Sequence, residues 1–390
     1  FSLERVAHMK TIDFCSDWTF RRSDKTVSVP VTLPHDAMIC GSLAPENPGK
    51  SPYAFFSGGI YRYEKRFFAP PEWTNMHVEI EFDGVYRNAV VQLNGHAVGG
   101  CEYGYLPFRV ILDQALRFGE ENMLSVEADS SELPNARWYT GGGIYRPVRL
   151  WVGRKQHIEA NGVTVTTLSH SPARVRVEIR HTGGDILVEI LNPDGSLAAR
   201  GRGDRDEIEL SGARLWSEQT PNLYICRCTL EINGAAIDIA ETTFGIRTLS
   251  WSPSGFLVNG TPTLLRGGCI HHDNGILGAC AYPVAEERKV RILKGAGFNA
   301  VRSAYNPCSD SMLAACDRLG MFVMDETWDM WYSRKNTYDY AQDFPSRYPD
   351  DIRALIARDY NHPSVILCKS ASTWPSLPPA CLSRQDSLPG

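Results

Sequence analysis

The stretch 297–326, GFNAVRSAYNPCSDSMLAACDRLGMFVMDE, decides the fold that the sequence predicts for the last third of this chain. Its apolar run Phe298–Val301 predicts a short strand. From residue 312 to residue 319 apolar side chains recur at helical spacing, and Gly320 is placed to end that helix. The run Met321–Met324 then predicts a second, buried strand. A strand, a helix and a strand in this order are typical of a parallel sheet.

Polar residues follow both predicted strands. Arg302 ends the first strand, and Asp325 and Glu326 come directly after the second. The carboxyl ends of the strands form the active face of parallel α/β barrels, so these three side chains are candidates for chemistry. Asp325 and Glu326 are adjacent on a strand, so their side chains should point to opposite faces and cannot form a catalytic pair.

The residue pattern within this stretch is more specific than any single short motif. It consists of Asn299, Arg302, Ser303, Pro307, Asp317, Gly320 and the apolar run to Met324. These residues resemble the barrel signature of glycoside hydrolase family 2, the family of β-galactosidases and β-glucuronidases. The chain departs from that signature at Tyr305, where the family usually has a histidine that contacts substrate. The resemblance implies a (β/α)8 TIM barrel, whose first strand we expect at Thr263–Arg266.

The first half of the chain predicts only β-structure. Between residues 11 and 152 short strand-like runs alternate with turns, and Asn94-Gly95 is a strong hairpin signal. Regular spacing of such strands is typical of a sandwich or a jelly roll. Three segments resemble the family's N-terminal sugar-binding domain: LPHDA at Leu33–Ala37, residues 82–95, and RWYTGGGIYRPVRLWV at Arg137–Val152.

A second β-domain is expected after the first. Strand-like runs between residues 158 and 244 are separated by turns, and Leu215-Trp216 resembles the core of the family's immunoglobulin-like sandwich. We therefore predict a multidomain chain in four parts. These are an all-β jelly-roll sandwich (1–153), an immunoglobulin-like β-sandwich (154–247), the N-terminal half of a TIM barrel (248–367) and a Ser- and Pro-rich tail (368–390) unlike the family.

Composition excludes several classes of protein. The net charge of −5 gives no reason to expect a nucleic acid or an anionic membrane as partner, and no apolar run approaches the roughly 20 residues that span a bilayer. The 11 cysteines are scattered, which favours reduced thiols in a cytoplasmic protein. We expect no cofactor, and Cys226 and Cys228 lack a second pair at zinc-ligand spacing. A weak divalent-cation site at Glu326 and Asp329 is a less favoured alternative to an exposed or hydrogen-bonded acidic pair.

The catalytic carboxyl groups can be sought by position. Hydrolysis with retention needs two carboxyl groups about 5 Å apart across the glycosidic bond. The resemblance places the acid/base in an Asn-Glu pair shortly after a segment like RDYNHPSVIL, which is present at Arg358–Leu367. Ser372 and Thr373 occupy the slots of that pair, and the nucleophile is expected from a later strand. We therefore expect that this chain contains neither catalytic glutamate and is inactive alone.

The resemblance and the aromatic content also indicate residues that contact a sugar. These candidates are His271, Tyr305, Trp138, Tyr139, Trp328, Glu326 and Arg302. For Arg302 a structural ion pair is the favoured alternative, and for Trp138 and Tyr139 it is packing between domains. The run His271-His272-Asp273 also fits metal binding or a structural role. Asp36 of the LPHDA segment is expected to be a structural turn acid.

Two functions follow from this pattern. The first is a retaining glycosidase of the β-galactosidase type, with a β-linked carbohydrate as partner. The alternative is a non-catalytic carbohydrate-binding or interaction protein made of the two β-sandwiches. An open half barrel would also expose strand edges and apolar surface, so self-association is expected.

Overall fold

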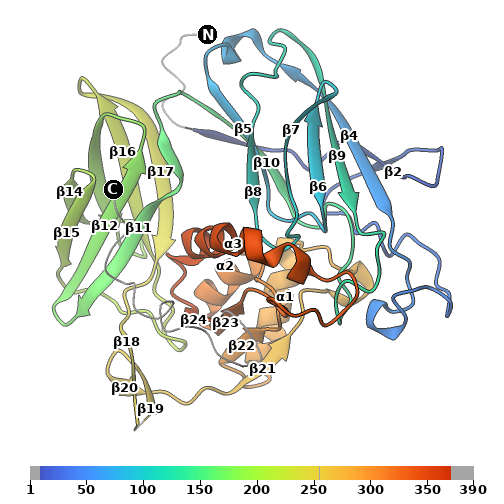
Figure 1. The fold of residues 1–390 in the computed structure, drawn as a ribbon. Coiled ribbons are helices and arrows are strands. Elements are labelled where there is room, and N and C mark those ends of the chain that lie inside the picture. The colour runs from blue at the N-terminus through green and yellow to red at the C-terminus, as the bar shows by residue number, and fades with distance from the viewer. Residues whose placement is uncertain (1–8, 254, 370–390) are drawn as a thin grey trace.

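The computed structural model describes residues 9–253 and 255–369. Figure 1 shows two β-sandwiches side by side, one from the N-terminal part of the chain and one from its middle, above an α/β part. The last described strand extends to Lys369, and the rest of the predicted tail, with Ser372 and Thr373, lies outside the described residues. No helix within the described ranges is long and apolar enough to cross a membrane.

The first sandwich joins a four-stranded and a six-stranded antiparallel sheet. Its strands alternate buried and exposed residues, and the buried ones, such as Trp18, Tyr61 and Phe82, form one core. Asn94 and Gly95 have φ values of 53° and 85°, which confirms the predicted hairpin between β6 and β7. The strands are β1 (Lys10–Asp13), β2 (Trp18–Arg22), β3 (Val29–Val31), β4 (Ile60–Ala69), β5 (His77–Phe82), β6 (Ala89–Leu93), β7 (His96–Cys101), β8 (Phe108–Ile111), β9 (Glu120–Asp129) and β10 (Val148–Gly153); single-turn helices η2 (Ser51–Tyr53) and η3 (Pro71–Trp73) lie between them.

The second sandwich pairs the sheet β11-β12-β15 with the sheet β14-β13-β16-β17. Its strands are β11 (Ile158–His170), β12 (Ala173–His181), β13 (Asp185–Leu191), β14 (Leu197–Arg202), β15 (Arg205–Leu210), β16 (Tyr224–Ile232) and β17 (Ala235–Phe244). The interpretation of Trp216 as part of this sandwich core is wrong. Trp216 instead packs with Val258, Ala300 and Phe322 of the α/β part, so it lies at the junction between the second sandwich and the α/β part.

The α/β part contains a parallel sheet in the order β21-β22-β23-β24. The helices α1 and α2 pack on one face of this sheet, as the alternation of strands and helices predicts. A small antiparallel sheet, β18-β19-β20, precedes it. The elements are β18 (Leu249–Ser252), β19 (Gly255–Val258), β20 (Thr261–Pro262), β21 (Gly267–Ile270), η4 (Gly275–Leu277), α1 (Pro283–Gly295), β22 (Ala300–Ser303), α2 (Asp310–Leu319), β23 (Phe322–Glu326), η5 (Tyr340–Gln342), α3 (Phe344–Asp359) and β24 (Val365–Lys369).

The first strand of the parallel sheet lies later than predicted. The expected strand at Thr263–Arg266 is wrong, because β21 begins at Gly267 and Leu264 is 71% exposed. A Cβ atom at Gly267 would come within 2.7 Å of the Ala300 carbonyl oxygen, so the close pairing of β21 with β22 needs a glycine here. By contrast, Gly320 ends α2 in the left-handed conformation, as predicted.

A largely buried ion pair holds the turn before β24. His362 Nδ1 lies 2.5 Å from Oδ2 of Asp317, whose Oδ1 accepts a hydrogen bond from the Ser364 N–H at 3.0 Å. Burial alone would lower the pKa of His362. The charge of Asp317 and its hydrogen bond outweigh burial and raise this pKa to about 9.

We therefore expect the free energy of unfolding to fall by about 2–3 kcal/mol as the pH rises from 6.5 to about 9. A histidine whose pKa is raised by folding stabilises the protein fully below its unfolded pKa, and this contribution is lost as the pH passes the folded pKa. Urea denaturation of the wild type and of His362→Gln over this range would check it. The variant should lack this pH dependence, and an equal slope in both proteins would contradict the assignment.

Candidate functional site

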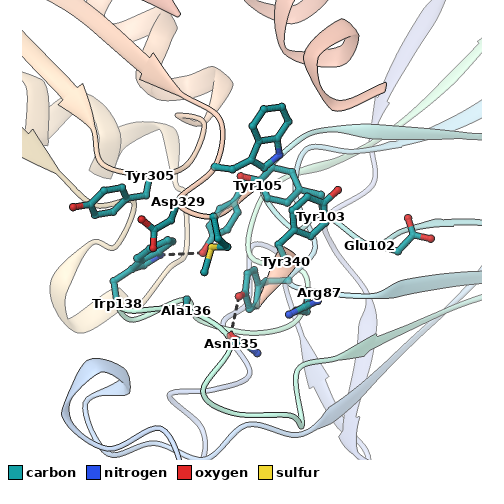
Figure 2. Close-up of a pocket in the computed structure, with 14 residues that line it drawn as sticks. Arg87, Glu102, Tyr103, Tyr105, Asn135, Ala136, Trp138, Tyr305, Asp329 and Tyr340 are labelled. Atoms are coloured by element: carbon teal, nitrogen blue, oxygen red, sulfur yellow. Dashed lines mark hydrogen bonds between the residues drawn. The ribbon is translucent and has the colours of Figure 1, made fainter. Parts of the chain in front are cut away.

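The strand ends of the parallel sheet meet a loop of the first sandwich. His271 follows β21, Tyr305 lies two residues beyond β22, and Asp329 lies three residues beyond β23. Trp138 of the first sandwich comes to the same edge, and Figure 2 shows it beside Tyr305 and Asp329. The structure thus brings residues from three strand ends and a distant loop together.

Arg302 and Glu326 form a two-point ion pair on the sheet. Arg302 Nε donates to Oε1 of Glu326 at 2.8 Å, and its Nη2 donates to Oε2 at 2.7 Å. Glu326 is 1% exposed and also accepts a hydrogen bond from the Tyr305 N–H at 2.9 Å. The structural pairing expected for Arg302 is therefore present, and it fixes the carboxylate in the floor of the site.

Asp325 points to the opposite face of β23, as its neighbouring position on the strand predicts. It accepts hydrogen bonds from the Ser303 hydroxyl at 2.5 Å and from the Cys308 N–H at 2.9 Å. Arg358 of α3 donates to its other oxygen at 2.8 Å. Asp325 thus belongs to the helix-covered side of the sheet, and Glu326 belongs to the candidate site.

Asp329 joins the barrel part to the sandwich loop. Arg137 donates to its Oδ2 and Oδ1 at 2.7 and 2.6 Å, and Lys335 Nζ lies 2.8 Å from Oδ1. Glu326 and Asp329 are therefore hydrogen-bonded acids, and each is paired with its own cationic side chains. The described part of the chain contains no group of three or more His, Cys, Asp or Glu side chains that could hold a metal ion.

Three of the sugar-contact candidates form an aromatic stack. The Trp138 ring lies 5.6 Å from the His271 ring at 17° and 5.3 Å from the Tyr305 ring at 24°. The guanidinium carbons of Arg137 and Arg302 lie 5.1 and 5.2 Å from the centre of the Tyr305 ring. Tyr305 has a φ of 73°, which is unusual for a residue with a side chain, and its bonded N–H helps to hold that conformation.

The other candidates serve internal contacts. Tyr139 donates its phenol proton to Asp36 Oδ2 at 2.6 Å, and the Trp328 indole N–H donates to Asp351 Oδ2 at 3.1 Å. Trp328 is buried and meets Phe344 edge to face at 5.0 Å. The polar groups of both aromatic residues are therefore bonded within the protein, and Trp328 lines the same cavity as Trp138 and Tyr305.

The two histidines after β21 differ. Burial lowers the pKa of His272 to about 3, and its Nε2 donates to the Thr140 carbonyl oxygen at 3.0 Å. His272 is thus a neutral link between the barrel part and the sandwich loop. His271 is only partly buried, and burial also lowers its pKa, so at neutral pH it is an uncharged donor and acceptor within the stack.

A cavity of about 30 Å³ lies between the sandwich loop and the barrel part, and Trp138 and Tyr305 of the stack line it (Figure 2). It has room for a water or two and not for a sugar ring. Tyr103 and Tyr105 also line this cavity, and the sequence analysis did not identify them. The Tyr105 hydroxyl accepts a hydrogen bond from the Trp138 indole at 3.1 Å. Arg137 was also missed, and its only signal was its place directly before the Trp138-Tyr139 pair.

Comparison with protein families identifies the scaffold. Residues 156–247 match the family model described as Glycosyl hydrolases family 2, and residues 252–372 match that of its TIM barrel domain. The two matches together cover more than half of the chain. The chain belongs to glycosyl hydrolase family 2. This confirms the family expected from residues 297–326, and it assigns the parallel sheet to the family's barrel domain.

Known proteins that are similar to this chain support the assignment to family 2. Beta-galactosidase BoGH2A of Bacteroides ovatus is 35% identical over 93% of this chain and 46% of its own length. A putative beta-glucuronidase of Formosa agariphila is 33% identical over 80% of this chain and 31% of its own. A solved family 2 structure from Bacteroides cellulosilyticus superposes with a TM-score of 0.87 at 35% identity, covering 93% of this chain and 51% of that one. The chain thus spans about half the length, or less, of these relatives.

Proposed function

We propose that this chain is the sugar-recognising part of a retaining β-glycosidase of the β-galactosidase type. The observation that carries the proposal is the convergence of His271, Tyr305 and Trp138 over the Arg302–Glu326 pair, at the carboxyl ends of barrel strands. Aromatic faces suit the C–H faces of sugars, and the imidazole and guanidinium groups can bond sugar hydroxyls. The names of the two curated relatives above support a terminal β-galactoside or β-glucuronide as the substrate.

In this proposal the chain binds the sugar but does not cleave it alone. Retaining hydrolysis needs one carboxyl group that attacks the sugar and another that protonates the leaving oxygen, about 5 Å apart. At the described strand ends, both oxygens of Glu326 and both of Asp329 already accept hydrogen bonds from arginine. The working carboxyl groups would therefore come from outside the described residues.

The barrel sheet also exposes part of its surface. Leu367 on β24 is 42% exposed, and Cys269 on β21 is exposed. An open parallel edge can pair with another chain, so we also propose self-association through this surface.

The binding proposal predicts that Tyr305→Ala weakens the binding of a β-linked sugar. Loss of a stacking ring worth about 0.5–1.5 kcal/mol should reduce affinity roughly 2- to 12-fold. The measurement is titration calorimetry with 4-nitrophenyl 1-thio-β-galactoside, which is not hydrolysed, and with the matching thio-β-glucuronide. Tyr332→Ala is the control, because Tyr332 is exposed and its only aromatic ring contact in the described structure is edge to face with Phe344.

The outcomes separate the two function classes. Binding that Tyr305→Ala weakens and Tyr332→Ala leaves unchanged supports the proposed site. Equal binding by all three proteins would favour a carbohydrate-binding protein that uses the sandwich surfaces. No binding at all would overturn both, and robust turnover of chromogenic β-glycosides by the purified chain would overturn the claim that it is inactive alone.

A further inference from the structure

Asp36, in the LPHDA segment of the first sandwich, is the centre of a buried hydrogen-bond cluster. It is 1% exposed. Its Oδ1 accepts hydrogen bonds from the N–H groups of Met38 at 2.9 Å and Gly142 at 3.0 Å. Its Oδ2 accepts from the N–H of Ala279 at 2.8 Å and from the Tyr139 hydroxyl at 2.6 Å. All four acceptor positions of the carboxylate are therefore used.

These partners show that Asp36 does more than close its own turn. Only the bond from Met38 is local, and it alone is what a turn acid would need. The other three partners lie far from Asp36 in the sequence: Tyr139 is 103, Gly142 is 106 and Ala279 is 243 residues away from it. The carboxylate thus joins the LPHDA turn, the Gly-rich sandwich loop and the barrel loop that follows His271.

The neighbouring glycines leave room for this carboxylate. A Cβ atom at Gly278 would lie 2.3 Å from Asp36 Oδ2, and one at Gly141 would lie 2.9 Å from the same oxygen. Both glycines have positive φ values, of 60° and 68°. The sandwich loop and the barrel loop therefore approach the carboxylate from two sides, closer than residues with side chains would allow.

We propose that Asp36 is a positioning residue that clamps the sandwich loop onto the first loop of the barrel. Trp138 directly precedes Tyr139, so the bond from Tyr139 to Asp36 holds the start of the loop that places Trp138 against His271 and Tyr305. The clamp itself stands on the hydrogen bonds, and only its effect on sugar affinity rests on the function proposed above.

The clamp needs a carboxylate and not merely a polar side chain. Burial and the nearby charge of Asp36 raise the pKa of Tyr139, so this phenol keeps its proton and acts as a donor. All four neighbours are then donors. An asparagine offers one oxygen and one NH2 group, so in Asp36→Asn at least one buried N–H of the cluster would face another donor.

Two variants and a matched control test the clamp. Asp36→Asn changes the centre of the cluster, and Tyr139→Phe removes one of its four bonds. Tyr282→Phe is the control, because the Tyr282 hydroxyl donates to the Pro34 carbonyl oxygen at 2.9 Å across the same junction without bonding Asp36. Amide hydrogen exchange at Gly142 and Ala279 reports the clamp without any ligand, and affinity for the thio-β-galactoside reports its effect on the site.

We expect faster exchange at both amides in Asp36→Asn, with affinity roughly 10-fold lower, and smaller changes of the same sign in Tyr139→Phe. Tyr282→Phe should match the wild type. Exchange at Gly142 and Ala279 that is unchanged in Asp36→Asn would overturn the clamp. If that variant does not fold, unchanged exchange in Tyr139→Phe would overturn it instead. If the wild type binds no thioglycoside, the proposed function fails and the exchange result still decides the clamp.

Discussion

Replacing Arg358 by methionine is expected to lower the free energy of unfolding by about 3–5 kcal/mol. The guanidinium is buried and donates to Asp325 Oδ2 at 2.8 Å, to the Cys308 carbonyl oxygen at 2.7 Å and to Asp359 Oδ1 at 2.5 Å. Methionine fills a similar volume but supplies no donor and no charge. The substitution would leave two buried carboxylates, those of Asp325 and Asp359, without the cation that pairs with them.

The position of this network explains why its loss should be costly. Asp325 lies on β23 directly before Glu326, and through Ser303 and Cys308 it also holds the end of β22 and the residues after it. Arg358 joins these strand ends to α3. Loss of the guanidinium should therefore loosen the strand ends that carry the candidate site.

The effect of Arg358→Met should depend on pH. Burial raises the pKa of Asp359 to about 7, although the charge of Arg358 acts in the opposite direction. A carboxyl group whose pKa is raised by folding costs stability once the pH exceeds its unfolded pKa, and removal of the arginine extends that cost to higher pH. The deficit of the variant should thus be smaller below pH 7 than above it.

Urea denaturation of Arg358→Met and Arg318→Met at matched pH would check this prediction. Arg318 forms an ion pair with Glu287 at 2.8 Å, but its side chain is 52% exposed, so its loss should cost about 0–1 kcal/mol. Similar losses in the two variants would mean that the buried network contributes no more than a surface pair, and would contradict the role assigned to Arg358.

Local signals in the sequence predicted much of the fold. Asn94-Gly95 and Gly320 specify positive φ, and the structure has a hairpin and a helix end at these positions. The opposite directions of Asp325 and Glu326 follow from strand geometry alone. Each of these features depends on residues within a few positions of one another, so the printed sequence contains all the information that they need.

The remainder depends on partners far away in the chain. Arg137 and Asp329 are 192 positions apart, so no local pattern predicts their ion pair. Tyr139 was a sugar-contact candidate by residue type, but the structure gives its hydroxyl to Asp36, 103 positions away. The strand β21 contains Gly267 and Gly268, which have low strand propensity, and only its pairing with β22 makes it a strand. Contacts between residues far apart in the sequence determine these features, and local sequence patterns do not contain that information.

The junction between the second sandwich and the barrel part should be almost as sensitive as the Arg358 network. Trp216→Ala is expected to cost about 3–5 kcal/mol. The Trp216 ring is fully buried, meets Phe322 edge to face at 5.7 Å, and its indole N–H donates to the Asp317 carbonyl oxygen at 2.9 Å. Alanine would leave a cavity between the two parts and an unpaired carbonyl oxygen at the end of α2.

Trp251→Ala is the matched control, because Trp251 is 59% exposed and its loss should cost no more than about 1 kcal/mol. Thermal unfolding of both variants, followed by near-ultraviolet circular dichroism, would measure the difference. A second, earlier transition in Trp216→Ala would show that the second sandwich unfolds separately once the junction is opened. If Trp216→Ala is as stable as Trp251→Ala, the two parts fold independently. The buried indole would then not hold the barrel sheet against the second sandwich.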